Sequence, residues 1–203
     1  MNVDQWKILM QKLGVAEHME MYVVLKEKYS ESHRYYHTSE HIKFCLTLFE
    51  SYRQLATHPE EVELAIWFHD AVYNIFSSTN ERDSAKLAAD FLRGAGLDSE
   101  LITRVSELIM ATSHETPLAN SDQALIVDID LSVLGCSPES YKEFEVAVRK
   151  EYKKIPFFLF KKGRKKILNS FLQRERIYSF PEFYQRYEAQ ARENITNAIC
   201  TLS

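Results

Sequence analysis

The sequence predicts an all-α fold organised as one domain. Apolar residues recur mostly three and four positions apart, which is the spacing of one helix face. Only five glycines and five prolines interrupt the 203 residues, and no segment alternates polar and apolar residues as a strand would. These observations place helices at about residues 2–13, 16–29, 36–56, 59–73, 81–95, 99–112, 122–134, 138–154, 161–178 and 181–201.

Four of these helices begin with recognisable capping sequences. Thr57 followed by Glu60 fits a capping box. Asn80 fits an N-cap ahead of an acidic first turn, which suits the positive end of the helix dipole. Proline is favoured in the first turn, so two further starts are expected at 137–138 and 179–182.

The composition limits the class of protein. With 45% hydrophobic residues, the chain can bury a substantial core. A formal charge of −4 predicts no general attraction to nucleic acids or anionic membranes. Cys45, Cys136 and Cys200 lack disulfide or zinc-finger spacing, which indicates reduced thiols. The first residues carry charges that a signal peptide would lack, and the apolar run 65–73 is too short to span a bilayer. We therefore expect a cytoplasmic protein without a membrane partner.

Three groups of ionisable residues lie on helix faces that should be buried. The first is His41, whose neighbours on the same face are Phe44, Cys45 and Leu48. A single inward-facing histidine is also explained by a satisfied structural role in the core, so His41 alone does not indicate a metal.

The second group is His69-Asp70, within a nearly all-apolar stretch. Both flank the buried side of the predicted helix 59–73, with Ala65 and Ile66 one turn earlier. A buried carboxylate needs a cation or strong hydrogen-bond donors. Either a divalent metal bound by both residues or a hydrogen-bonded His–Asp pair would meet that need.

The third group is Asp128 and Asp130, two residues apart in an apolar helix. They point about 200° apart, so one of them should face inward. Asp130 has only apolar neighbours three and four residues away and is the better candidate, although Asp128 stays open.

Together these residues favour one metal site over three unrelated structural roles. Imidazole and carboxylate ligands suit one divalent ion, either Mn, Fe, Co, Ni or Zn, with Mg less well suited. Four protein ligands on an octahedral ion would leave two positions, one for water and one for a phosphate oxygen.

Several motifs connect the chain with a known family. Residues 34–41 read Arg-x-Tyr-His-x-x-x-His, and His69-Asp70 forms an HD pair. The chain thereby resembles the HD superfamily of metal-dependent phosphohydrolases, in particular a bacterial branch that carries the first motif. Further matching stretches are 67–73, 80–81, 84–85, 111–112 with His114, 128–135, Arg149, 151–152, 163–164 and 191–194.

This resemblance implies a helical HD domain over residues 1–203. The metal-binding core would lie at about 34–135, with the C-terminal helices 138–201 packing on it. It further implies a phosphohydrolase that acts on a nucleotide or other small phosphoester. The implied metal ligands are His41, His69, Asp70 and Asp130.

Other residues are candidates for contact with that substrate. Arg34 could hold a phosphate bidentately, and His37 could act as general acid or phosphate ligand. An exposed helix terminus would explain His37 equally well and Arg34 slightly less well. Asp70 would also help to deprotonate a water molecule. His114 is expected to bind substrate or to support the metal ligands. Arg149 and Arg164 match the family's pattern and are expected to bind the phosphate.

Alternative functions remain open at this point. Residues 37–41 match the inverted zinc motif of metallopeptidases, with His37 and His41 as zinc ligands and Glu40 as the base. Di-iron oxygenases with an HD fold would need more histidines. A ligand-binding or regulatory protein that keeps the fold without turnover is a further alternative, although the presence of all four expected ligand types argues against it. The apolar terminal helices could be buried within one monomer or in a homodimer.

Overall fold

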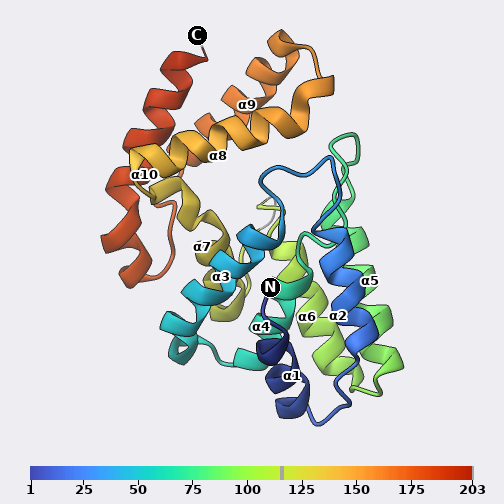
Figure 1. Cartoon of the computed structure of the whole chain (residues 1–203). Helices are drawn as coiled ribbons and strands as arrows, with labels where there is room; N and C mark the ends of the chain where they lie inside the picture. Colours follow the sequence, from blue (N-terminus) through green and yellow to red (C-terminus); the bar gives the residue numbers. More distant parts are fainter. Residues whose placement is uncertain (115–116, 203) are drawn as a thin grey trace. The chain divides into compact units, whose positions relative to one another are not determined.

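The computed structural model describes residues 1–114 and 117–202 and confirms the all-α prediction (Figure 1). These residues form ten α-helices and three short 3-10 helices, and no strand occurs among them. The α-helices are α1 (Val3–Lys12), α2 (Met19–Lys28), α3 (Ser39–Tyr52), α4 (Pro59–Phe68), α5 (Asn80–Gly94), α6 (Ser99–Ala111), α7 (Ser121–Leu131), α8 (Pro138–Glu151), α9 (Phe157–Leu172) and α10 (Pro181–Thr201). The 3-10 helices are η1 (Arg53–Leu55), η2 (Ser132–Gly135) and η3 (Tyr152–Lys154).

The chain divides into two compact units, Met1–Val127 and Asp128–Ser203. Helix α7 begins in the first unit and ends in the second. The expectation of one domain over residues 1–203 stays a prediction.

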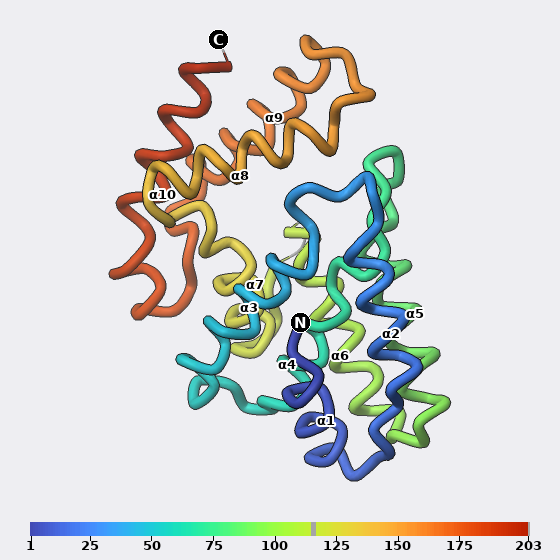
Figure 2. The backbone as a smooth tube through the Cα atoms, viewed as in Figure 1, coloured from blue at the N-terminus to red at the C-terminus, as the bar shows by residue number. Residues whose placement is uncertain are grey.

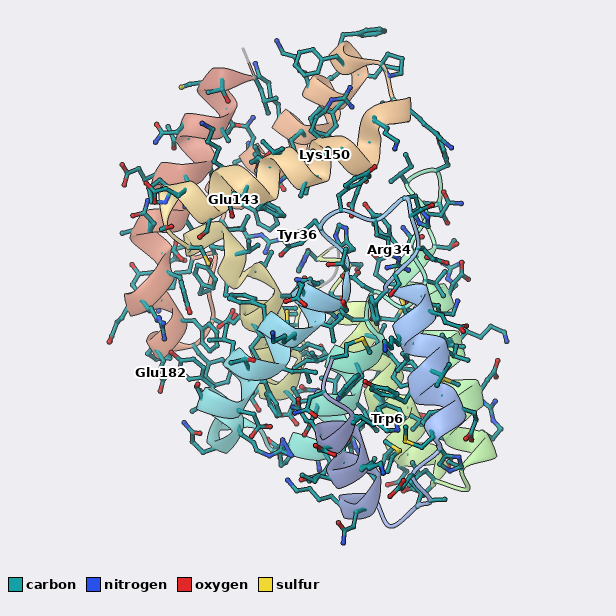
Figure 3. The ribbon with its side chains drawn as sticks, viewed as in Figure 1. Trp6, Arg34, Tyr36, Glu143, Lys150 and Glu182 are labelled. Atoms are coloured by element: carbon teal, nitrogen blue, oxygen red, sulfur yellow. The ribbon has the colours of Figure 1, made fainter. Side chains whose placement is uncertain are left out.

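Helix α4 forms the centre of the first unit. It contacts α1, α3, α5 and α6, and its residues from Glu61 to Phe68 are all buried. A helix that is apolar nearly all round is stable only when other elements surround it. Trp6 of α1, labelled in Figure 3, packs edge-on against Trp67 of α4, with the ring centroids 5.3 Å apart. This packing fixes the position of the segment that follows α4.

The second unit is built around η2 and α10. Asn194 donates from its side-chain amide to the carbonyls of Leu134 and Cys136, at 2.9 Å each. A Cβ atom on Gly135 would come within 2.6 Å of Tyr187, so only glycine allows this close approach.

The ten predicted helices are all present, but several of their ends differ. Helix α4 ends at Phe68 rather than 73, because the Arg34 guanidinium donates to the carbonyls of Asp70 and Ala71, which would otherwise accept from the next helical turn. Helix α3 begins at Ser39 rather than 36, because the Thr38 side chain caps it by accepting a hydrogen bond from the backbone N–H of Glu40. Helix α9 covers Phe157–Leu172 rather than 161–178. Residues 177–178 instead donate their backbone N–H groups to the Glu188 carboxylate.

The capping box predicted at Thr57 is wrong. The N-cap of α4 is His58, and no side chain of the predicted box caps it. The backbone N–H groups of Thr57 and His58 donate instead to the carboxylate of Asp122, at 2.7 and 2.9 Å. A distant residue therefore supplies the acceptor that local sequence was expected to supply.

The other predicted helix starts have mixed outcomes. Ser137 caps α8 as predicted, accepting from the N–H of Ser140. Asn80 is the first residue of α5 and bonds back to Asn74, while Thr79 holds the N-cap position. Phe180, not Ser179, is the N-cap of α10.

Two expectations that came from composition concern cysteines and membrane spans. Cys45, Cys136 and Cys200 are free thiols. Over residues 1–114 and 117–202, no helix is both long enough and apolar enough to cross a bilayer.

Candidate metal centre

His69 and Asp70 lie on the turn that ends α4. His69 still has helical backbone angles, and its N–H donates to the carbonyl of Ala65 at 2.8 Å. The N–H of Ala71 donates to the carbonyl of Phe68, which forms a tight turn. The HD pair therefore sits just after the helix rather than within it, which corrects the predicted helix.

His41 lies in the first turn of α3 and points into the core of the first unit. It is 5% exposed, and His69 is 3% exposed. The two ring atoms Nε2 lie 3.2 Å apart. The Asp70 Oδ2 atom lies 3.4 Å from Nε2 of His41 and 3.2 Å from Nε2 of His69. Residues 28 positions apart in the sequence thus bring three donor atoms into one small triangle.

The sides of this triangle fit a single metal ion. Nitrogen and oxygen ligands lie about 2.1 Å from a first-row divalent metal. Two such ligands are about 3.0 Å apart in an octahedral arrangement and about 3.4 Å apart in a tetrahedral one, by simple geometry from that bond length. The observed separations of 3.2, 3.2 and 3.4 Å fall within this interval.

The hydrogen bonds of His69 orient its ring for metal binding. Its Nδ1 lies 3.0 Å from the carbonyl oxygen of Ile66, which can only accept, so Nδ1 carries the hydrogen. In neutral His69 the lone pair is then on Nε2, which faces the Asp70 carboxylate. Two acceptors at 3.2 Å repel each other unless a cation lies between them, either a proton or a metal ion.

Asp70 is held in its charged form. Burial alone would raise the pKa of this carboxyl group, but the charges of His69 and His37 and hydrogen bonds from the two buried histidines outweigh burial and hold the pKa well below its usual range. An ionised carboxylate at this position is a suitable ligand for a divalent cation.

The choice between Asp128 and Asp130 can be argued from the hydrogen bonds of Asp128. Its carboxylate accepts from the backbone N–H groups of Ser179 at 2.9 and 3.0 Å and of Phe180 at 2.7 Å. It thereby holds the start of α10 and is completely buried. These contacts explain Asp128 structurally and leave Asp130 as the candidate ligand. Asp130 belongs to α7 in the second unit.

Arg34 is buried rather than open to a substrate. Its side chain has no exposed surface. It donates to Glu31 and to the backbone carbonyls of His37, Asp70 and Ala71. The predicted role of Arg34 as a phosphate ligand finds no support in these contacts.

His37 and His114 lie at the ends of connections in the first unit. His37 is half-buried just before α3; its ring centroid lies 4.3 Å from that of Tyr73 and 6.0 Å from that of His41. His114 follows α6 with a positive φ of 58°, a conformation that non-glycine residues adopt rarely. The substrate-binding roles of both stay predictions.

Arg149 and Arg164 belong to the second unit and already have internal contacts. Arg149 donates to the carbonyl of Tyr152. Arg164 forms a two-point ion pair with Glu145, at 2.7 and 3.2 Å, and its side chain is 11% exposed. A phosphate would have to compete with that carboxylate, so the structure gives no support to Arg164 as a phosphate ligand.

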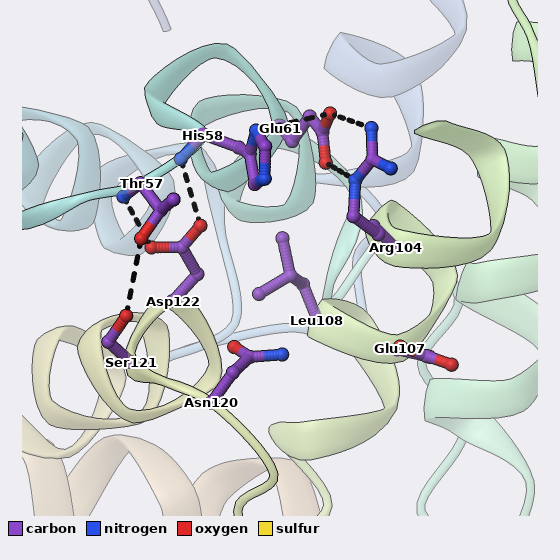
Figure 4. Close-up of a pocket in the computed structure, with 9 residues that line it drawn as sticks. All are labelled: Thr57, His58, Glu61, Arg104, Glu107, Leu108, Asn120, Ser121 and Asp122. Carbon is purple, nitrogen blue, oxygen red and sulfur yellow. Dashed lines mark hydrogen bonds and ion pairs between the residues drawn. The ribbon is translucent and has the colours of Figure 1, made fainter. Parts of the chain in front are cut away.

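A small cavity lies at the opposite end of α4, around residues 57–61 (Figure 4). Its volume is about 150 Å³. Three of its charged groups bond within the protein: Asp122 accepts from the start of α4, and Glu61 pairs with Arg104 at 2.7 and 2.8 Å. We assign this region to the stability of α4.

Three further residues, which were not among the predicted site residues, support the turn that carries His69 and Asp70 (the HD turn). The Tyr29 hydroxyl donates to the carbonyl of Trp67 at 3.0 Å, and His33 bonds the carbonyl of Tyr73 at 3.0 Å. Ser84 accepts from the N–H of Val72 at 3.0 Å. Only Ser84 carried a signal in the sequence, because it lies in one of the stretches that match the HD branch.

Comparison with known proteins adds no identification. No protein-family model matches the chain, and neither a curated protein nor a solved structure is detectably similar to it.

Proposed function

We propose that this chain is a metal-dependent phosphohydrolase of the HD type. The observation that carries the proposal is the buried triangle of His41, His69 and Asp70, whose donor atoms are spaced for one divalent ion. Asp130 is the proposed fourth ligand. The reaction class and the substrate, a nucleotide or other small phosphoester, rest on the resemblance of the sequence motifs to that superfamily.

The roles of the residues follow from their chemistry. A divalent metal held there would supply Lewis acidity toward a phosphate oxygen and would lower the pKa of a water molecule. Asp70 is assigned to metal binding, and its carboxylate would also help to deprotonate a metal-bound water molecule. His37, whose ring lies tilted against that of Tyr73 and 6.0 Å from that of His41, is the proposed proton donor or phosphate ligand.

A ligand-binding or regulatory protein without turnover is the second candidate. It is favoured by the internal contacts of Arg34 and Arg164, which leave fewer cationic groups for a phosphate than the sequence motifs predict. The metallopeptidase interpretation is disfavoured: Glu40 has 77% of its side chain exposed, and His37 precedes α3. A cytoplasmic location and a homodimer stay predictions.

The test combines metal analysis with activity. The purified protein, stripped with a chelator and then reconstituted with Mn²⁺, is assayed for bound metal and for phosphate release from nucleotides and an aryl phosphate. We expect one ion per chain and phosphate release that is lost on stripping and in Asp70→Ala. His58→Ala is the control, because it changes a histidine at the far end of α4.

Each outcome separates the candidates. Bound metal without phosphate release would favour the regulatory protein. Absence of metal binding under all loading conditions would overturn the proposal, and the His–Asp contacts would then be a protonated structural pair.

A further inference from the structure

The C-terminal end of α4 is buried, and its last backbone carbonyls need hydrogen-bond donors from elsewhere in the chain. The last carbonyls of any helix lack partners within it. Here Trp67, Phe68 and Ala71 have no exposed surface, so water cannot donate hydrogen bonds to their carbonyls. The donors come from the connection between α2 and α3, which Figure 2 shows as a separate loop of the same unit. Tyr29 donates to the carbonyl of Trp67, and Arg34 donates to the carbonyls of Asp70 and Ala71.

Arg34, labelled in Figure 3, makes the largest share of these contacts. Its Nη1 donates to the carbonyl of Asp70 at 2.7 Å and its Nη2 to that of Ala71 at 3.0 Å. The guanidinium also lies 5.3 Å from the ring centroid of Tyr29 and 5.4 Å from that of Tyr73, which fixes its plane. Its positive charge at the C-terminal end of α4 also complements the helix dipole.

The same guanidinium contacts the second ligand-bearing element. Its Nη1 donates to the carbonyl of His37 at 3.1 Å, four residues before His41. Its Nε donates to the carboxylate of Glu31 at 2.9 Å, and this contact within the same connection fixes the arginine side chain. Arg34 therefore links the chain leading to His41 with the turn that carries His69 and Asp70.

We propose that Arg34 is a positioning residue, which sets the distance between His41 and the His69-Asp70 pair and does not bind phosphate. This inference rests on the proposed metal site. A lysine would keep the charge but would not reproduce these contacts, because its three N–H groups share one nitrogen on a flexible stem, whereas the guanidinium spreads its donors over a rigid planar fork. Loss of a residue that orients metal ligands typically weakens metal affinity about 10–100-fold.

The experiment compares the full-length wild type with Arg34→Lys and Arg34→Gln. Co²⁺ affinity is measured by competition with a chromophoric chelator, the visible Co²⁺ spectrum reports ligand geometry, and thermal unfolding of the metal-free protein reports stability. Arg53→Lys is the matched control, because Arg53 is also largely buried and pairs with Glu63 nearer the other end of α4.

We expect both Arg34 variants to bind Co²⁺ about 10–100-fold more weakly and to change its visible spectrum. Arg53→Lys should lower thermal stability while leaving Co²⁺ affinity and spectrum unchanged. Rescue by lysine relative to glutamine should be small, because neither side chain has the planar fork of donors that reaches the separate carbonyls.

Three results would overturn the inference. Arg34 variants could bind Co²⁺ as tightly as the wild type. They could keep that affinity while inorganic phosphate inhibits their phosphate-releasing activity less than it inhibits that of the wild type, which would restore Arg34 as a phosphate ligand. Alternatively, Arg53→Lys could weaken Co²⁺ equally, which would reduce the effect to general stability. A wild type that binds no Co²⁺ would overturn the proposed function and this inference together, so the wild-type measurement separates the two failures.

Discussion

The carboxylate of Asp122 should contribute more to stability than an ordinary helix cap. It is 5% exposed and accepts two backbone hydrogen bonds, from Thr57 at 2.7 Å and His58 at 2.9 Å. A hydrogen bond to a charged group contributes about 1.5–3 kcal/mol. Because Thr57 and His58 are themselves exposed, water can partly solvate the freed N–H groups, so the lower value applies to each. We therefore expect Asp122→Ala to lower the free energy of unfolding by about 3 kcal/mol.

A graded series makes this prediction specific. Asp122→Asn retains one acceptor oxygen without the charge, so its loss should be about half that of alanine. Asp98→Ala is the control: Asp98 also accepts two backbone N–H groups, at the start of α6, but in an exposed position, so its loss should be smaller than that of Asp122→Ala. The metal-free proteins are unfolded in urea and followed by circular dichroism, with the midpoints compared at a common slope.

The result can refute the reasoning in two ways. Equal losses for Asp122→Asn and Asp122→Ala would mean that the accepted hydrogen bonds do not carry the effect. An Asp122→Ala loss no larger than that of Asp98→Ala would mean that burial of the cap is irrelevant. Metal affinity should change little in the series, because the HD turn lies at the other end of α4.

Three further predictions concern other sites. Burial raises the pKa of Glu63 to about 7, above that of the unfolded chain. The folded state therefore binds a proton that the unfolded chain releases, so the free energy of unfolding should fall by up to about 3 kcal/mol as the pH rises from 4.5 to 7, and Glu63→Gln should remove this dependence in urea titrations across that range. Gly135→Ala should cost about 2–3 kcal/mol by chemical denaturation, because the new Cβ would lie 2.6 Å from backbone and Cβ atoms of Tyr187; a neutral effect would show that η2 can shift. A divalent metal at about 100 times its Kd should stabilise the wild type by about 2.7 kcal/mol, a rise in Tm of roughly 5–10 °C, and Asp70→Ala should show no rise in a thermal-shift assay.

The sequence predicted the helices well because each buries an apolar face against neighbours. The three-and-four spacing that marks such a face is a local property, and it located all ten helices. It also indicated that His41 and His69 are buried and that Asp70 lies at the edge of the core, because polar residues interrupt apolar stretches there. Proximity of these three residues was an expectation, and the distances of 3.2–3.4 Å between their donor atoms agree with it.

The ends of helices were predicted less well, because distant residues decide them. Nothing near Thr57 indicates that Asp122, 65 residues later, accepts its N–H. Nothing near Asp70 indicates that Arg34, 36 residues earlier, takes its carbonyl and ends the helix.

By itself, the sequence determined the fold class and the residue types that can hold a cation, since both follow from patterns along one segment. Only the tertiary structure decided what Asp128 and Arg34 do. Each carries a charged group that looked suited to chemistry, yet each bonds two backbone groups far away in the sequence: Asp128 accepts from Ser179 and Phe180, and Arg34 donates to Asp70 and Ala71. A charged side chain is available to a ligand only when the folded chain leaves its hydrogen-bonding atoms unused. That depends on backbone groups brought near it by folding, and no local pattern records them.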